Sequence, residues 1–170
     1  SDEENGAVGW VEYPAETYAE LCAFLSLVGP EADRADWARR ARTLLMYVID
    51  RALPGAAEGQ PYRDPEFSTR DRSRWHGEGF ALTVDWIYPH LTSEDKAKIR
   101  TVFLRWAAEN ADASITGHDH PLPKGVVNDP VLIDSPSKTR WAVNNYYTAH
   151  MRNLGLMSMA LDPADDPGGE

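Results

Sequence analysis

Residues 77–99 read GEGFALTVDWIYPHLTSEDKAKI, and this stretch predicts two helices joined by a tight turn. The first part belongs to a helix that the apolar spacing places at about residues 70–88, and Pro89 ends that helix within a turn. Thr92 then suits a helix N-cap, with Asp95 three residues later in the capping-box position, where Glu or Gln is more usual. The stretch therefore predicts the third and fourth helices of the chain.

Helical spacing also predicts two helices before this stretch. The first begins after Pro14 and ends at residues 29–30, a Gly-Pro pair. Its apolar residues share one helical face, formed by Tyr18, Leu21, Cys22 and Leu25. The second covers 31–53, with acidic residues early and arginines later, as the helix dipole favours. Its expected core positions are Trp37, Ala41, Leu44, Leu45, Val48 and Ile49.

A fifth helix begins near Ser137 and contains RWAVNNYYTAHMRNLGLMSMAL, residues 140–161. It is apolar nearly all round, so we expect it to be covered on most sides. The second and fourth helices are amphipathic and are expected to lie outside it. Five helices joined partly by short turns predict an all-α fold of stacked antiparallel helical hairpins, with the inner and outer layers that a helical ring needs.

The composition of the 170-residue chain limits the classes of partner. Its formal net charge of -10 argues against a nucleic-acid backbone and against a basic membrane-surface patch. No apolar run is long enough to span a membrane. The single cysteine, Cys22, excludes an internal disulfide and a Cys-based metal cage. The length suits one helical domain over 1–170, and both ends lead us to expect an N-terminal fragment whose partner is the remaining part of the parent chain.

The fifth helix carries polar side chains but no acidic residue from Arg140 to Leu161. Tyr146, Tyr147 and His150 fall on a stripe with leucines and methionines, and a histidine there is most often a satisfied core residue. Asn145, Thr148 and Arg152 fall on the opposite side together with Trp141. Arg and Asn are rarely buried without partners, although exposure at a helix end would also explain them. These residues either line a site or are hydrogen-bonded in the core.

The third helix holds a second set of candidates. Glu78 and Asp85 lie on one face of the helix, two turns and so roughly 10 Å apart along its axis. This distance is near the upper end of the separation between the two carboxyl groups of an inverting glycosidase. Two acids on one helix face are more often a solvated edge. Gly77 and Gly79 weaken a helix, so we expect them to permit the close approach of a neighbouring helix or a ligand. His76 falls among apolar positions, which favours the core.

The long segment between the fourth and fifth helices contains the one cluster that suggests a metal, at His118, Asp119 and His120. Loops longer than about 12–15 residues are uncommon in compact domains and tend to be functional or disordered. Three adjacent residues without a distant fourth ligand make a poor metal signature. We therefore predict an ordinary polar loop, with no metal site and no cofactor.

Two stretches resemble a known family. Residues 77–99 are similar to a helix-turn-helix of heparinase II/III-like and alginate lyase-like polysaccharide lyases, where an Asp-Trp, an aromatic, a Pro and a Leu precede a capped acidic helix start. Residues 144–166 resemble the later inner helix of that domain, where an Asn-Asn pair precedes a Gly-containing apolar helix. The two stretches lie within about half of the chain. The resemblance implies an incomplete (α/α) toroid in a periplasmic or secreted carbohydrate-active protein.

The resemblance also implies β-elimination on a uronate-containing polysaccharide or oligosaccharide. Asn145 would neutralise the substrate carboxylate, and His150 with Tyr146 or Tyr147 would transfer protons, because the enolate needs placed donors and a Tyr base needs cationic neighbours. The chain departs from the family where Tyr146 directly follows the Asn pair, a place more often held by a His or another aromatic. The substrate-binding candidates are Arg152, Trp141, Asn144, Glu78 and His76.

Two alternatives stay open. A glycoside hydrolase on the same architecture would use Glu78 or Asp85 with a carboxylate elsewhere. A non-catalytic domain that binds a glycan or a protein would instead place Asn145, Tyr146 and His150 in packed core. Fold alone does not choose among these functions.

Overall fold

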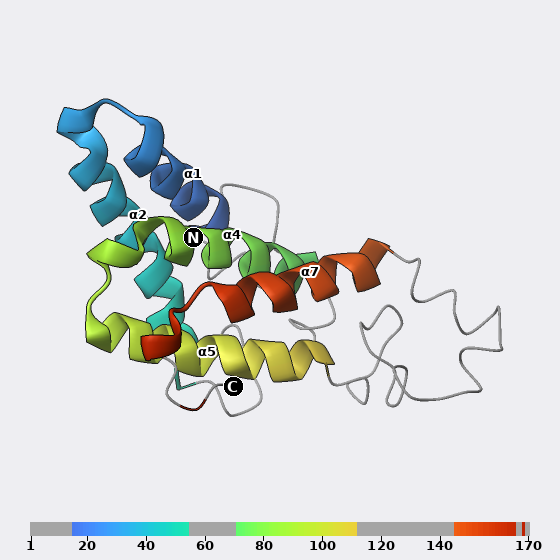
Figure 1. Cartoon of the computed structure of the whole chain (residues 1–170). Coiled ribbons are helices and arrows are strands. Elements are labelled where there is room, and N and C mark those ends of the chain that lie inside the picture. The colour runs from blue at the N-terminus through green and yellow to red at the C-terminus, as the bar shows by residue number, and fades with distance from the viewer. Residues whose placement is uncertain (1–14, 55–70, 112–144, 166–167, 169–170) are drawn as a thin grey trace, which may run out of the picture.

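The computed structural model of the chain describes residues 15–54, 71–111, 145–165 and 168, and within 71–76, 108–111 and 145–151 it describes only the backbone. The elements in these ranges are all helical, which confirms the predicted all-α class. They are α1 (Ala15–Val28), α2 (Glu31–Ala52), α4 (Asp71–Ile87), η1 (Tyr88–His90), α5 (Ser93–Ala111), α7 (Asn145–Met159) and η3 (Pro163–Asp165). Figure 1 shows α4 between α1 and α7.

The turn between α1 and α2 forms where the Gly-Pro pair predicted it. The Gly29 amide donates to the Leu25 carbonyl oxygen at 2.9 Å. A Cβ atom at Gly29 would lie 2.6 Å from that same oxygen, so a larger residue would force the turn to shift. Arg34 adds a hydrogen bond from its Nε to the Gly29 carbonyl oxygen at 2.9 Å. The end of the first helix is therefore set locally by sequence.

α1 packs through its small residues. Its buried side consists of Ala15, Glu16, Ala19, Cys22, Ala23 and Ser26. The face predicted from Tyr18, Leu21, Cys22 and Leu25 is divided: Cys22 is buried, whereas Tyr18 and Leu21 are exposed. Small side chains allow α1 to approach α2 and α4 closely, and the large apolar residues lie on the other side of the helix.

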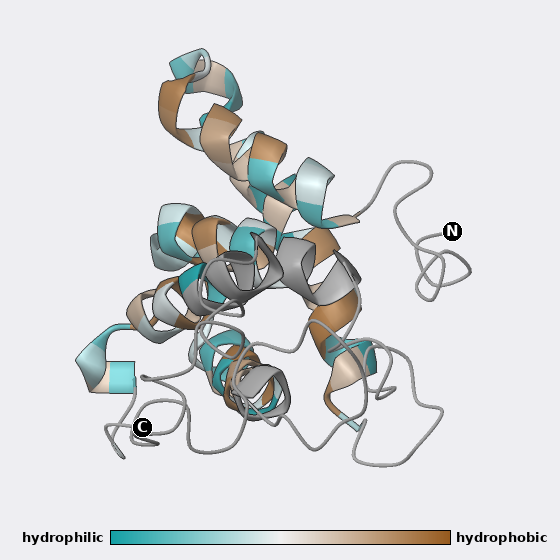
Figure 2. Ribbon diagram, turned by 90° about the vertical axis from the view of Figure 1, so that its right-hand side faces the viewer, coloured by the Kyte–Doolittle hydropathy of each residue, from teal (hydrophilic) through white to brown (hydrophobic). Residues whose placement is uncertain are grey.

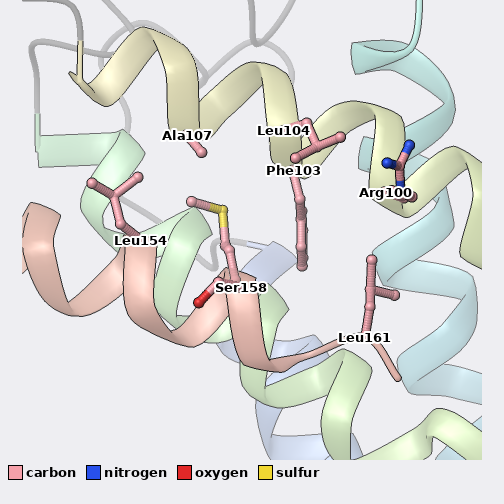
Figure 3. Close-up of a pocket in the computed structure, with 8 residues that line it drawn as sticks. Arg100, Phe103, Leu104, Ala107, Leu154, Ser158 and Leu161 are labelled. Carbon is pink, nitrogen blue, oxygen red and sulfur yellow. The ribbon is translucent and has the colours of Figure 1, made fainter. Parts of the chain in front are cut away.

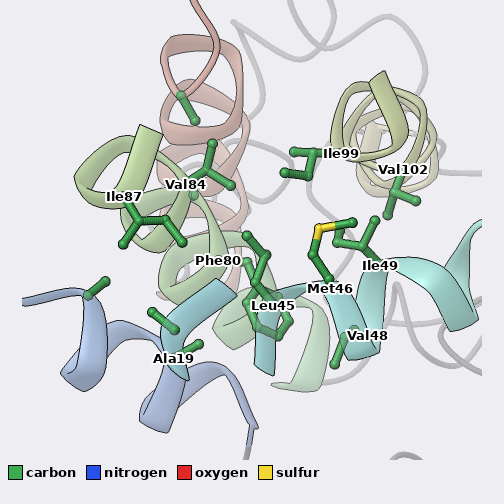
Figure 4. Close-up of a cluster of buried hydrophobic side chains, with 14 of the residues drawn as sticks. Ala19, Leu45, Met46, Val48, Ile49, Phe80, Val84, Ile87, Ile99 and Val102 are labelled. Carbon is green, nitrogen blue, oxygen red and sulfur yellow. The ribbon is translucent and has the colours of Figure 1, made fainter. Parts of the chain in front are cut away.

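The core lies where α2 packs against α1, α4 and α5 (Figure 4). The predicted core positions of α2 are confirmed, since Ala41, Leu45, Val48 and Ile49 are buried and Trp37 and Leu44 pack against the core. Burying a large aliphatic side chain stabilises a fold by about 1.5–3 kcal/mol. The largest contributions from α4 and α5 are Phe80, Val84, Ile87, Ile99, Val102 and Trp106.

The capping box predicted at the start of α5 is confirmed. The Thr92 amide donates to Asp95 Oδ2 at 2.8 Å, and the Asp95 amide donates to Thr92 Oγ1 at 3.1 Å. Arg42 of α2 donates two further hydrogen bonds to the same carboxylate, at 2.8 and 2.9 Å. The first turn of α5 is therefore attached to α2 as well as capped.

α7 packs mainly against α4 and less extensively against α5 (Figure 1). Asn153 and Met157 are buried, but Arg152, Ser158 and Met159 are exposed. The prediction that this helix is covered on most sides is wrong for its described side chains, because the neighbouring helices cover one side. The predicted helical start near Ser137 lies outside the described residues. Among the described helices, none has the length and apolar character needed to cross a membrane.

Candidate functional site

The predicted catalytic residues fall at the start of α7. The first two turns of this helix contain Asn145, Tyr146, Tyr147 and His150, and the structure describes only the backbone there. An α-helix repeats every 3.6 residues, so Tyr146 and His150 are neighbours one turn apart, as predicted. Of the predicted substrate-binding residues, His76 lies in the part of α4 where only the backbone is described. Trp141 and Asn144 lie outside the described residues.

The structure brings two of the predicted residues together as an ion pair. Arg152 of α7 donates from Nη2 to Glu78 Oε2 of α4. The Arg152 side chain is 50% exposed and that of Glu78 37%, so both remain accessible to a ligand. The sequence proposed both residues for substrate binding but did not predict that they contact each other.

Glu20 of α1 adds a second carboxyl group that the sequence analysis missed. Burial raises the pKa of Glu20 above its usual range, and the negative charge of Glu78 raises it further, while Arg152 opposes both effects. Glu20 is therefore close enough to this ion pair for their charges to interact. Glu16 and Glu20 are the two acids of this otherwise largely apolar helix, and they were the signal that sequence reasoning could have used.

Two buried polar side chains lie beneath these charges. Asn153 of α7 packs against Gly77, where a Cβ atom would lie 2.7 Å from the Asn153 Cβ. Glu16 of α1 packs in the same way against Gly79, where a Cβ atom would lie 3.1 Å from the Glu16 Cβ. The two glycines thus admit neighbouring helices, which confirms the predicted reason for their presence. They bring α1, α4 and α7 together at one place.

This place, which we call the α1/α4/α7 junction, is formed by Glu16, Glu20, Glu78, Arg152 and Asn153. It combines paired and partly buried charges with an accessible rim, an arrangement that suits proton transfer or the binding of a polar ligand. Within the described ranges, no group of three or more His, Cys, Asp and Glu residues could hold a metal ion. The predicted polar loop at 118–120 lies outside those ranges.

A separate cavity of about 210 Å³ lies between α5 and α7 (Figure 3). Its lining residues are Phe103, Leu104, Ala107, Leu154, Met157 and Leu161, with Arg100 and Ser158 as the polar members. Walls of this kind offer few partners for the hydroxyl groups of a sugar. The cavity is therefore chemically distinct from the polar α1/α4/α7 junction.

No family model, curated protein or solved structure matches this chain. The chemistry of the junction and the residues at the start of α7 are therefore the basis on which a function is inferred.

Proposed function

We propose that the chain is a carbohydrate-active helical domain of the polysaccharide lyase type, acting on a uronate-containing polymer by β-elimination. The observation that supports it most is the contact between Arg152 and Glu78, because it joins predicted residues of two different helices at an accessible rim. Asn145, Tyr146, Tyr147 and His150 lie on the same helix as Arg152, within two turns of it.

Each residue has a role that its chemistry suits. The Asn145 amide would donate to the substrate carboxylate, which lowers the cost of removing the adjacent proton. His150 would act with Tyr146 or Tyr147 in taking that proton and protonating the leaving oxygen. Arg152 would provide the positive field that a tyrosine base needs, with Glu78 holding its guanidinium in place.

The test is an assay for the unsaturated uronate that β-elimination leaves on the product. The protein is mixed with alginate, heparan-type and other uronate polymers, and ultraviolet absorbance is followed. We expect absorbance to rise with at least one polymer. The rate should fall at least about a hundredfold in His150→Ala, since acid–base groups contribute about 10²–10⁴-fold, and by about as much in Asn145→Ala, since one placed hydrogen-bond donor contributes about 10²–10³-fold.

The matched control is His90→Ala, which removes an exposed histidine on η1 and should leave the rate unchanged. Circular dichroism establishes that each variant folds. A folded His150→Ala protein with the full rate would contradict the assigned role of His150. The absence of an absorbance rise with every polymer would contradict the lyase proposal.

A glycoside hydrolase is the second candidate, and the position of Glu20 favours it. Hydrolysis needs two carboxyl groups whose environments differ, one to donate a proton and one to remain ionised. Burial and the charge of Glu78 raise the pKa of Glu20, which suits a proton donor, while Glu78 contacts Arg152. Asp85, the other predicted acid, is exposed on α4.

Release of reducing ends from neutral polysaccharides tests the hydrolase. A proton donor with a raised pKa is protonated below that pKa, so the rate should fall as pH rises through it. Glu20→Gln should remove this activity, whereas Glu31→Gln, a change at an exposed acid of α2, should not. Release that is unchanged in Glu20→Gln would exclude the acid role.

A further inference from the structure

The cavity between α5 and α7 is a feature that the proposed function does not use. α7 packs less extensively against α5 than against α4, and the space between α5 and α7 measures about 210 Å³. Figure 1 and Figure 2 show α1 standing out from the part of the fold that contains α5 and α7. The lining residues come from α5, from α7 and from Leu161 just after α7, so none of them belongs to the α1/α4/α7 junction.

The cavity is about as long as two helical turns. Figure 3 shows Arg100 and Leu161 at one end of it and Ala107 and Leu154 at the other. Arg100 and Ala107 are two turns apart on α5, which is roughly 10 Å along the helix axis. Pockets for drug-sized ligands measure about 300–1,000 Å³, so a cavity of about 210 Å³ suits a smaller molecule. These dimensions favour a slender chain that lies along the two helices.

The walls of the cavity favour a hydrocarbon body. Phe103 of α5 and Met157 of α7 line it and are only 3% and 4% exposed, so the cavity reaches the buried core. An apolar cavity holds water poorly and accepts apolar molecules, because water there lacks hydrogen-bond partners. Ser158, at the exposed rim, already donates its hydroxyl hydrogen to the Gly155 carbonyl oxygen at 2.8 Å. A polar group of the ligand therefore finds no donor hydrogen at Ser158.

Arg100 is the charged residue among those that line the cavity. It is half-buried, so its methylene groups can form part of the wall while its guanidinium stays near water. A guanidinium donates two parallel charged hydrogen bonds to a carboxylate, and these are stronger than its hydrogen bonds to a neutral hydroxyl group. The Arg100 end of the cavity therefore favours a carboxylate and disfavours an ammonium group.

We propose that this cavity binds an aliphatic monocarboxylate of the medium-chain fatty acid class. Its hydrocarbon chain lies between Phe103 and Met157 and extends toward Ala107, and its carboxylate accepts hydrogen bonds from Arg100. This binding site is independent of the proposed carbohydrate function, so the failure of one proposal leaves the other standing.

Isothermal titration calorimetry of the wild-type chain tests the ligand class. We expect octanoate to bind at one site per chain with a dissociation constant between about 1 μM and 1 mM, as suits a ligand of this size. Octanol has a chain of the same length and should bind at least about tenfold more weakly, because it forms no charged hydrogen bond with Arg100. Octylamine, with a positive charge, should bind more weakly than octanol.

Two substitutions test the two ends of the cavity. Ala107→Leu fills the apolar end and should weaken octanoate binding at least about tenfold, whereas Ala97→Leu, at an exposed alanine of α5, should not. Arg100→Gln should remove the preference for octanoate over octanol, and Arg39→Gln, at a 67% exposed arginine of α2, should retain it. Urea denaturation establishes that each variant folds, and the comparison of ligands on the wild-type chain needs no variant.

The methyl signals of the methionines locate the bound ligand by nuclear magnetic resonance. Octanoate should shift the Met157 methyl signal in proportion to the bound fraction and leave that of Met46, in the core beside α2, in place. Equal affinities for octanoate and octanol would overturn the assignment of a carboxylate. The absence of saturable binding, full affinity in folded Ala107→Leu, or a Met157 signal that does not move would overturn the site.

Discussion

Asp95 shows how one side chain can join two helices. Its carboxylate accepts hydrogen bonds from the Thr92 amide within the α5 cap and from the Arg42 guanidinium of α2. Burial alone would raise the pKa of Asp95, but the hydrogen bonds from Arg42 and Thr92 outweigh burial and hold it below its usual range. A carboxyl group with a lowered folded-state pKa stabilises the fold above its unfolded pKa, and this stability is lost as pH falls through the folded value.

We therefore expect Asp95→Ala to lower the free energy of unfolding by about 2 kcal/mol at neutral pH, through loss of the cap and of charged hydrogen bonds. Asp95→Asn should cost less, because it keeps an acceptor for the Thr92 amide. Urea denaturation measures both, with Asp36→Ala as a control at a more exposed ion pair, where a change below about 0.5 kcal/mol is expected. If the difference in the free energy of unfolding between the wild-type protein and Asp95→Ala stayed the same at acidic pH, the ionised Asp95 carboxylate would not be the source of that stability.

The same residues show what sequence could predict at this level. Thr92 and Asp95 are three positions apart, so their capping box is a local pattern and was predicted. Arg42 is 53 positions from Asp95, and its hydrogen bonds depend on how α2 meets α5. The ion pair of Arg152 with Glu78 likewise spans 74 positions. Both residues were candidates by type, but their contact arises from tertiary packing.

The helix pair α4 and α7 offers a direct test of helix approach. A Cβ atom at Gly77 would lie 2.7 Å from the Asn153 Cβ and 2.9 Å from its Cγ, so the helices would have to separate or Asn153 would have to move. At Gly155 of α7, a Cβ atom would meet nothing within 4 Å in the described structure. The two glycines thus differ in surroundings although both are helical.

We expect Gly77→Ala to lower the free energy of unfolding by about 1–3 kcal/mol, as overpacking does, despite the better helix propensity of alanine. Gly155→Ala should instead raise it by about 0.5–1 kcal/mol, since only the propensity changes. Thermal and urea denaturation of the Gly77→Ala and Gly155→Ala proteins measure the two changes in the free energy of unfolding. Equal effects of the two substitutions would show that α4 and α7 do not approach closely at Gly77.

α1 shows that helical periodicity alone does not predict which side of a helix is packed. The spacing correctly predicted a helix ending at the Gly-Pro pair, and it found an apolar face. It could not identify the packed side, because α1 approaches α2 and α4 through small residues whose hydropathy contributes little to the pattern. The stability of a packed interface depends on how closely the side chains of the two helices fit together as well as on the apolar area they bury. That fit depends on the shape of the partner helices.

Across the whole fold, the residues after α7 are held against the turn between α4 and α5. Tyr88 of η1 donates its hydroxyl hydrogen to Asp165 Oδ2 at 2.5 Å and accepts from the Asp162 amide at 3.0 Å. Lys96 of α5 donates to the same Asp165 oxygen at 2.9 Å. Nothing local in the sequence indicates that Tyr88, 77 positions away, would bind Asp165.

The hydrogen bonds from Tyr88 and Lys96 lower the pKa of Asp165, so the contact should be complete above the unfolded pKa of that carboxyl group and weaken as pH falls through the folded one. Amide hydrogen exchange at Asp162 reports on it directly, because that amide donates to Tyr88. Tyr88→Phe should reduce the protection of the Asp162 amide relative to the wild-type protein at the same pH, while Tyr47→Phe, on the exposed side of α2, should not. Equal protection in wild-type and Tyr88→Phe would mean that packing of η3 against α5, and not the hydroxyl group, positions the end of the described fold.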